Sequence, residues 1–481
     1  MALHRWVLWS MKNHTSNPPM QHSCIVNRII PVFPFSPSAS KFMRKQTSLT
    51  LDEPLTRASL QRRINDIGFG PHQTVILVIC GSLLFFQGGY TFFARRVVET
   101  DRKDWMPFWL LSGLPVAGII SGGFISMATL SWGRRANVII SLLTVGMAAF
   151  CTSAVSYVLF NVFLSHVGLG LGLPNIFALA VESSPTRSLG LCVGALVACI
   201  VLGEVYAATA SWILPTSCGD DWLCDFQFGL GIVSFPMLIA GIASVAGLAE
   251  SPFFMMKDCY ILNSLLNTMR AANRISSSDD PRVETRFVPS LVSATPEPSL
   301  SGRTVLVCGF LIGCVRAFYS SYPHPESHVA IGSLSALTGT VLGTIFAQTT
   351  GPRTSASILP FVLMAVAGSG LVVASSWTGL ALFQSWIIFC VCKALSLALF
   401  VALIMVVSCD LRGLTMAFII GTALSGLFPS FLAMNSVVEE VSFSILFGLA
   451  GLAAASNLGS CEDELVSFKK IPILGKSYGS I

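Results

Sequence analysis

Twelve stretches of this chain are long and apolar enough to cross the hydrocarbon core of a bilayer, which takes about 20 residues as a helix. Lipid offers no partner for free backbone amides, and none of the stretches alternates in the manner of a barrel strand. The sequence therefore predicts an all-α integral membrane protein with twelve transmembrane helices. The predicted spans cover 73–95, 106–130, 137–157, 158–181, 188–214, 226–249, 303–321, 327–348, 356–376, 379–408, 414–434 and 441–458.

The composition favours the same interpretation. The chain of 481 residues is 53% hydrophobic and only 11% charged, whereas a soluble domain carries about a quarter charged residues. So apolar a surface needs lipid around it, and the bilayer is the expected partner. The net charge of +5 is modest and the basic residues form no continuous stripe, so nucleic acid is not expected as a partner.

Basic residues orient the chain, because Lys and Arg accumulate in the cytoplasmic loops of membrane proteins. Most of the 29 fall in the two terminal segments, the central linker and the loops on the same side. The first loop of the opposite side is expected to hold Arg95, Arg96, Arg102 and Lys103. Both termini are therefore predicted to be cytoplasmic, in either the plasma membrane or an intracellular vesicle membrane.

A long polar stretch divides the spans six and six, which is typical of secondary transporters built from repeats. The expected parts are a mostly disordered segment (1–72), two six-helix bundles (73–249 and 303–458), a cytoplasmic linker (250–302) and a cytoplasmic tail (459–481). "LTRASLQRRINDIGFG" and "YILNSLLNTMRAANRI" have helical spacing and predict short helices before the first and after the sixth span.

The turn "LSWGRRANV" places two arginines between the second and third spans. Gly133 permits a tight turn, and Arg134 and Arg135 can reach carboxylates or the terminal carbonyls of neighbouring helices. Such a clamp would hold a cytoplasmic gate in one state. The alternative is that both arginines only anchor the turn on the cytoplasmic side.

These features resemble the major facilitator superfamily, in particular its sugar and organic-ion porter branch and the synaptic-vesicle-protein-related group. The resemblance rests on the Gly-Arg-Arg turn, on "HVGLGLGLPNIFALAVESSPTRSLG", "AESPFFMMK" and "INDIGFGPHQ", and more weakly on "TTGPRTS" and "CDLRG". It implies two pseudo-symmetric six-helix bundles. It also implies secondary-active or facilitative transport of a small organic solute, an organic ion or a sugar, by alternating access.

Departures from the family pattern keep a second function open. Leu130 stands where the family has an aspartate, so the arginines must find another carboxylate, Glu182 or Glu250. Gln87 and Tyr90 align with two acids of the first span in the related group. A transport-inactive member acting as a membrane receptor or scaffold is therefore the alternative. The residues expected to act in gating are Gly133, Arg134, Arg135, Glu182, Arg187, Glu250, Arg353 and Arg412.

Three ionisable residues lie within spans near mid-membrane, where each is costly unless it faces protein or water. They are Glu204, Arg316 and Lys393. Two cations against one carboxylate favour an anionic or zwitterionic substrate, and Glu204 is also a candidate proton carrier. The alternative is a structural ion pair of Glu204 with Lys393 or Arg316. With the spans that line the family's central cavity, the expected substrate-binding residues are Gln87, Tyr90, Glu204, Arg316, Tyr319, Trp386 and Lys393.

No motif indicates covalent chemistry, so the sequence predicts neither an enzyme nor a cofactor. His324 and His328 are interpreted as solvated loop residues rather than metal ligands. Cys218 and Cys224 flank a polar loop between two spans, where a disulfide forms if the loop faces an oxidising compartment. The expected partners are a small solute and, as an option, protons, and the expected state is a monomer.

Overall fold

The computed structural model describes residues 56–100, 113–154, 157–213, 222–273, 300–321, 329–374, 379–408 and 410–432, and every structural statement below concerns these residues. Within them, every regular element is a helix. The first elements are α3 (Arg57–Ile67), α4 (Pro71–Thr100), α6 (Leu114–Ala128), η3 (Leu130–Trp132), α7 (Arg134–Ala154), α8 (Val158–Glu182), η4 (Thr186–Ser188), α9 (Leu189–Ile213) and α10 (Trp222–Gly247). They are followed by η5 (Phe254–Lys257), α11 (Cys259–Ala272), α12 (Gly302–Ser321), α13 (Val329–Thr350), α14 (Pro352–Ala374), α15 (Gly379–Val407) and α16 (Leu411–Leu432).

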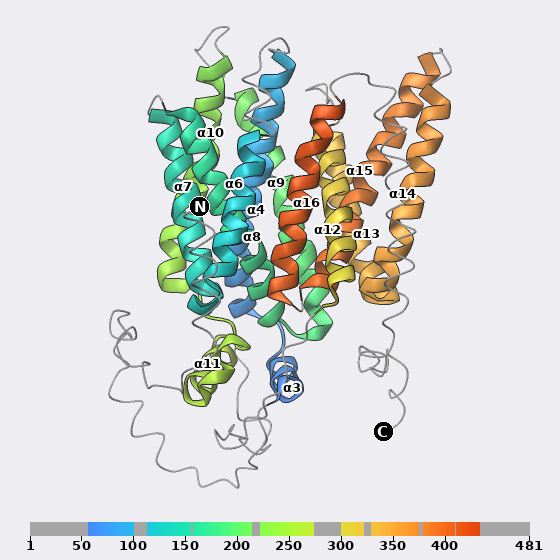
Figure 1. The fold of residues 1–481 in the computed structure, drawn as a ribbon. Coiled ribbons are helices and arrows are strands. Elements are labelled where there is room, and N and C mark those ends of the chain that lie inside the picture. The colour runs from blue at the N-terminus through green and yellow to red at the C-terminus, as the bar shows by residue number, and fades with distance from the viewer. Residues whose placement is uncertain are drawn as a thin grey trace, which may run out of the picture. The chain divides into compact units, whose positions relative to one another are not determined.

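Eleven of these helices coincide with the first eleven predicted spans, and Figure 1 shows them running side by side. The twelfth predicted span, 441–458, lies outside the described residues. Six of the described helices are long and apolar enough to cross a membrane, and three further apolar helices are shorter. The predicted short helices before the first span and after the sixth are α3 and α11.

The end of α4 corrects the predicted loop boundary. The helix continues to Thr100, so Arg95 and Arg96 belong to it rather than to the following loop. Hydropathy falls at an arginine pair, but arginine is itself a good helix former. The side chain of Arg95 is moreover held inside the protein by a carboxylate described below.

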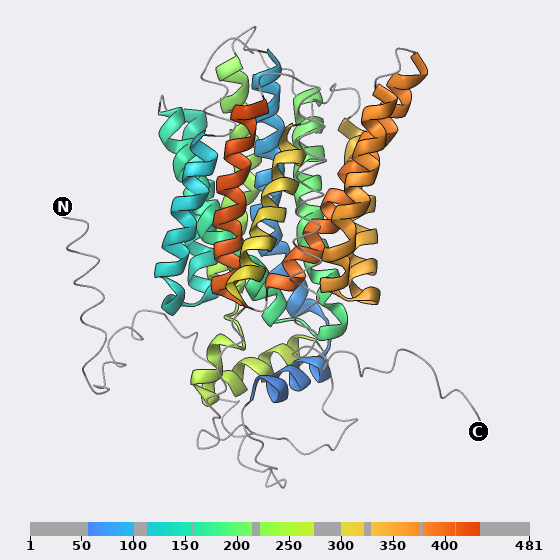
Figure 2. The same cartoon turned by 45° about the vertical axis from the view of Figure 1, so that its right-hand side comes forward.

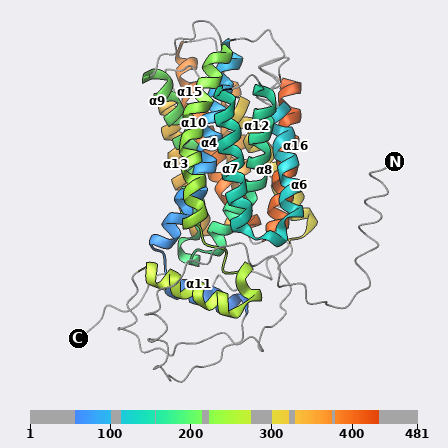
Figure 3. The same cartoon turned by 90° about the vertical axis from the view of Figure 1, so that its left-hand side faces the viewer.

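Glycines allow the helices of the first half, α4 to α10, to approach closely. A Cβ at Gly122 of α6 would collide with the backbone of α8 at Val167, and one at Gly170 of α8 would collide with Ile119 of α6. Glycines at this crossing therefore let α6 and α8 pack backbone against backbone. Figure 3, viewed from the side of the first half, shows α10 and α7 side by side.

Helices of the second half, α12 to α16, pack on those of the first. α13 and α15 contact α9, while α16 contacts α6 and α8. Within the second half, α12 lies against α16, and α15 lies against both α13 and α14 (Figure 2). A crossing of α9 and α13 is again close, because a Cβ at Gly194 would collide with the side chain of Thr344.

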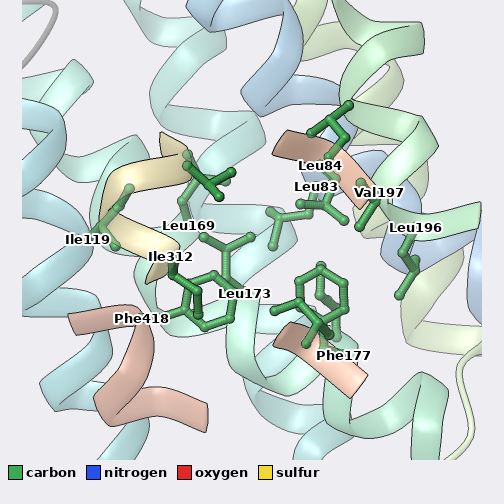
Figure 4. Packing of buried hydrophobic residues seen from close by; sticks show 14 of the residues in the cluster. Leu83, Leu84, Ile119, Leu169, Leu173, Phe177, Leu196, Val197, Ile312 and Phe418 are labelled. Atoms are coloured by element: carbon green, nitrogen blue, oxygen red, sulfur yellow. The ribbon is translucent and has the colours of Figure 1, made fainter. Parts of the chain in front are cut away.

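One apolar core connects both halves, and Figure 4 shows part of it. Phe177 of α8 and Phe418 of α16 are stacked with ring centroids 6.0 Å apart. Phe400 of α15 meets both rings edge-on at 6.3 and 6.4 Å. Aromatic pairs at these separations are favourable, so the three rings close the space between α8, α15 and α16.

A second, smaller core joins α3 to α11 at the end of the bundle where the turns 130–135 and 183–188 lie. Asn65 of α3 accepts the backbone N–H of Thr186 at 2.8 Å, and Gln73 of α4 donates to the carbonyl of Ser183 at 3.1 Å. Asn273, just after α11, donates to Gln73 at 3.1 Å. These bonds attach both short helices to the turn that follows α8. The core consists of Leu60, Ile64, Ile67, Leu262, Leu266 and Met269.

Candidate substrate site and gating turn

Glu204 on α9 forms the centre of a buried charge cluster, named here the Glu204 cluster. Its Oε2 lies 3.2 Å from Nζ of Lys393 on α15, and its Oε1 lies 3.6 Å from Nη1 of Arg95 on α4. The residues Glu204 and Lys393 are only 2% and 3% exposed. Of the two ion pairs that the sequence left open, the structure contains the one with Lys393.

Close backbone packing brings α9 against α4 at this level. A Cβ at Gly88 would collide with the carbonyl of Ile200, and a Cβ at Gly203 would collide with the carbonyl of Phe85. The carboxylate on the next residue, Glu204, is therefore presented to Arg95 two turns further along α4. Because Lys393 belongs to the second half, the pair ties the two halves together.

Arg316 on α12 lies apart from the Glu204 cluster, in what we call the Arg316 site. Its Nη1 donates to Oγ1 of Thr422 on α16 at 3.1 Å. Tyr90 on α4 and His166 on α8 lie within electrostatic range of its guanidinium. No carboxylate among the described residues pairs with it, although a guanidinium has five N–H donors. A cation with neutral neighbours is suited to an anionic ligand.

A group of aromatic rings is centred on Tyr90 in the first half. Tyr90 is 4% exposed, and its ring lies 4.4 Å from that of His166 in an edge-on arrangement. The rings of Phe226 and Phe86 follow at 6.0 and 6.3 Å from Tyr90. These rings, called the aromatic wall here, are of the kind that contacts planar or apolar ligands.

Two residues of this region, Arg95 and His166, were missed by the sequence interpretation. Arg95 was placed in a loop, and His166 is a single histidine in a glycine-rich apolar span. The sequence did contain a weak signal for His166, since an ionisable residue inside a span usually has a functional role. Nothing in the local pattern indicated which way either side chain faces.

The other expected substrate residues are placed as follows. Gln87 is partly buried on α4, and its carbonyl accepts the hydroxyl of Thr91 at 2.8 Å. Tyr319 belongs to α12 and Trp386 to α15, but both side chains lie outside the described part of the structure. Within the described residues, no group of His, Cys, Asp and Glu is arranged to hold a metal ion.

The candidate gating turn, residues 130–135, lies at one end of the bundle. Glu250, which follows α10, organises this turn. Its Oε1 accepts the backbone N–H groups of Arg134 and Arg135 at 2.9 and 3.2 Å. A carboxylate there stabilises the N-terminus of α7. Gly133 has φ +96° and ψ 166°, a region essentially reserved for glycine, and a Cβ would collide with the Glu250 carboxylate.

Both arginine side chains of the turn bind neighbouring helices of the first half. Nη2 of Arg134 lies 3.1 Å from Oε1 of Glu182 at the end of α8, and its guanidinium lies over the ring of Phe254 at 5.3 Å. Nη2 of Arg135 donates to the carbonyl of Val245 on α10 at 2.8 Å. The turn therefore joins the ends of α7, α8 and α10.

Burial raises the pKa of Glu250 above its ordinary value of 4.5. Hydrogen bonds from the backbone of Ser251, Arg135 and Arg134, together with the charge of Arg134, act in the opposite direction, but burial is the larger cause. A proton at this position would remove the negative charge at the N-terminus of α7, so the charge of the turn depends on pH.

The remaining arginines expected in gating lie outside this turn. The carbonyl of Arg187 accepts Nε2 of Gln348 on α13 at 3.1 Å, which is a contact between the halves. The carbonyl of Arg353 accepts the hydroxyl of Ser357 at 3.0 Å. The backbone N–H of Arg412 donates to Asp410, a cap of α16. The structure thus brings together Gly133, Arg134, Arg135, Glu182 and Glu250, but not Arg187, Arg353 and Arg412.

Cys224, in the first turn of α10, is disulfide-bonded. Cys218 lies outside the described residues, so the pairing of these two cysteines stays a prediction. Eight other cysteines in the described part of the chain are not disulfide-bonded.

No protein-family model matches the sequence. The 4-hydroxybenzoate transporter PcaK of Acinetobacter baylyi is 27% identical to this chain over 186 residues. That match covers 36% of this chain and 40% of the relative, so the chain aligns with less than half of the relative's length.

Solved structures resemble the chain over most of its length. The structure of the proton:xylose symporter XylE of E. coli is similar to this chain with a TM-score of 0.59 at 13% sequence identity. The alignment covers 84% of this chain and 97% of the XylE chain. The human organic anion transporter MFSD10 has a TM-score of 0.52 at 12% identity and covers 80% of this chain and all of its own. The chain therefore has the major facilitator fold and is an integral, multi-pass membrane protein.

Proposed function

We propose that this protein transports a small organic anion across a membrane by alternating access. The observation that carries the proposal is Arg316, a cation within the helix bundle whose recorded hydrogen-bond partner is the neutral hydroxyl of Thr422. Its unused N–H donors suit a carboxylate, which binds a guanidinium through two parallel hydrogen bonds. The substrate in this proposal supplies the counter-charge.

The named relatives support a small organic solute and differ on its charge. PcaK transports 4-hydroxybenzoate, whose carboxylate and ring would match Arg316 and the aromatic wall, and MFSD10 is an organic anion transporter. XylE transports xylose together with protons, so an uncharged sugar as substrate and coupling to protons are the alternative that this relative supports. A guanidinium without a carboxylate partner favours the anion, because a sugar would leave this half-buried charge without a counter-ion.

In the proposed cycle, the bundles 73–249 and 303–458 rock about the Arg316 site, joined by the linker 250–302 and flanked by the segments 1–72 and 459–481. The Phe177, Phe400 and Phe418 rings would part when the site opens toward the turn end. The 130–135 turn would act as a rigid brace of the first bundle, and the Arg187–Gln348 contact would break between the halves. Arg353 and Arg412 would contribute on the second bundle.

The finer assignments extend this proposal. The turn end would face the cytoplasm with both termini, in the plasma membrane or a vesicle membrane, and the protein would act as a monomer without nucleic acid. Kinship with the synaptic-vesicle-protein-related group rests on the motifs alone. A second candidate, a transport-inactive receptor or scaffold, is favoured by Leu130, Gln87 and Tyr90 in place of the family's acids and by the internal pairing of Glu204.

Purified protein in liposomes tests the proposal. Uptake of radiolabelled 4-hydroxybenzoate would be compared with that of D-xylose, each with and without a proton gradient. We expect saturable uptake of the anion and little of the sugar. Uptake of xylose alone would replace the anion with a sugar, and the absence of uptake for a panel of anions and sugars would favour the receptor or scaffold.

A further inference from the structure

Thr422 on α16 accepts the hydrogen bond of Arg316 and departs from the usual behaviour of a threonine in a helix. A threonine hydroxyl inside a helix commonly donates to the carbonyl four residues earlier. Thr415 on the same helix does so, with its Oγ1 2.7 Å from the carbonyl oxygen of Leu411. In the described part of the chain, no such bond joins Thr422 to Phe418. Its Oγ1 instead accepts Nη1 of Arg316 at 3.1 Å, so the side chain is directed to α12.

A close crossing of α12 and α16 brings this short side chain within reach of the guanidinium. A Cβ at Gly421, the residue before Thr422, would lie 2.9 Å from the carbonyl oxygen of Gly309. A Cβ at Gly313 would lie 2.9 Å from the carbonyl oxygen of Gly421. Small residues let two helix backbones approach in this manner. Thr422 is only 1% exposed, so water does not compete for its contact with Arg316.

The bond to Thr422 leaves one edge of the Arg316 guanidinium complete. It uses a hydrogen of Nη1, and no described residue accepts from Nε or Nη2. These two nitrogens carry parallel N–H groups, an arrangement that matches both oxygens of a carboxylate. Arg316 is partly exposed, and neither nitrogen is buried without a partner. The Nε–Nη2 edge is therefore accessible to a ligand.

We propose that Thr422 is a positioning residue of the anion site, which holds Arg316 with its Nε–Nη2 edge toward the substrate and so favours carboxylates. The inference rests on the proposed function, of which it names the anion class and the residue that selects it. An arginine side chain has many rotamers, and fixing one of them before the ligand arrives reduces the entropy lost on binding. An anion with one charged oxygen cannot use both N–H groups in parallel and gains less from a fixed edge.

Calorimetric titration of the purified full-length protein with two ligands tests this. 4-Hydroxybenzoate presents two carboxylate oxygens, whereas pentafluorophenolate is an aromatic anion with one charged oxygen. Thr422→Val keeps the shape of the side chain and removes the hydroxyl. We expect it to weaken the binding of 4-hydroxybenzoate about two- to tenfold, with little change for pentafluorophenolate. Thr422→Ser retains the hydroxyl and should bind both ligands as the wild type does. A wild type that binds only the carboxylate also supports the preference.

Thr415→Val is the matched control, because the Thr415 hydroxyl bonds within α16. Thr415 is buried like Thr422, and its variant should bind both ligands with wild-type affinity. In liposomes, Thr422→Val should raise KM for 4-hydroxybenzoate and leave the maximal rate near that of the wild type, because the residue acts on binding. Thr422→Ala removes the same hydroxyl and repeats the test if Thr422→Val does not fold.

Three results would overturn the inference. One is wild-type affinity for 4-hydroxybenzoate in Thr422→Val. Another is a Thr422→Ser variant as weak as Thr422→Val, since the hydroxyl would then be irrelevant. The third is equal weakening for both ligands, which would mean that Thr422 supports the helix crossing and does not orient the guanidinium.

The proposed function can fail separately from this inference. If the wild type binds neither ligand, the failure lies in the proposed anion site. If Arg316→Ala loses 4-hydroxybenzoate binding and Thr422→Val does not, the anion site stands and the positioning role of Thr422 alone is wrong.

Discussion

The Glu204 cluster and the Arg316 site both place cations among transmembrane helices, but the partners of these cations differ. In the cluster, Glu204 pairs with Lys393 at 3.2 Å and lies 3.6 Å from Arg95, so each cation has a carboxylate neighbour within the protein. At the other site, Arg316 donates to the hydroxyl of Thr422 and has no carboxylate partner among the described residues. A buried pair of this kind is poor evidence of stabilisation, since desolvation offsets most of the attraction. The comparison teaches that a satisfied charge joins helices, whereas an unsatisfied one is available to a ligand.

The largest effect is expected from breaking the cluster. Lys393→Ala leaves a buried carboxylate with only Arg95, 3.6 Å away, and removal of one partner of a buried pair costs about 3–5 kcal/mol. Thermal unfolding of the purified variant should show a large drop in Tm. The double variant Lys393→Met with Glu204→Gln should recover much of it, because the orphaned charge is gone. A single variant as stable as the wild type would contradict a structural role.

Arg316→Ala is expected to affect transport rather than stability: the variant should fold normally but lose most of its transport activity. Loss of a charged hydrogen bond to the ligand costs about 1.5–3 kcal/mol, or roughly 10- to 100-fold in uptake efficiency. Arg303→Ala, an exposed arginine on the same helix, is the matched control. Initial rates of 4-hydroxybenzoate uptake measure the effect. If the yield of folded Arg316→Ala protein falls as much as its uptake rate, Arg316 has a structural role like that of the Glu204 cluster.

Gly133→Ala tests whether the turn 130–135 is packed too closely around Glu250 to accept a side chain at residue 133. The conformation at φ +96° and ψ 166° costs a non-glycine residue about 1–3 kcal/mol. Gly351→Ala is the control, because Gly351 has a similar φ of +93° but no atom lies within 4 Å of an added Cβ. Thermal unfolding should show the greater loss for Gly133→Ala, since only that Cβ meets Glu250. Equal losses would mean that the carboxylate simply moves aside.

The smallest effect concerns pH. Burial raises the pKa of Glu250 above 4.5, so the folded protein keeps a proton where the unfolded chain has released it. Stability should therefore fall as pH rises from about 4.5 through the raised pKa and be level above it. Comparison of Tm against pH for the wild type and Glu250→Gln isolates this slope. A wild type that gains stability over this window relative to the variant would show that the capping hydrogen bonds dominate.

Span positions were predictable because an apolar run of membrane length is a property of the sequence itself. The contacts of the turn with Glu182 and Glu250 followed from carboxylates at span ends close to a pair of arginines. The division of Glu204, Lys393 and Arg316 into two sites did not follow. These helices are apolar on every side, so no polar face indicates their rotation. The same gap hid the inward direction of Arg95 and of His166.

An experimental structure with 4-hydroxybenzoate bound tests the central claim most directly. We expect the ligand carboxylate within hydrogen-bond distance of the Arg316 guanidinium, its ring against Tyr90, and Glu204 still paired with Lys393. A carboxylate bound to Lys393 with the Glu204 pair broken would contradict the account, because the anion would then be held at the charge that we consider satisfied.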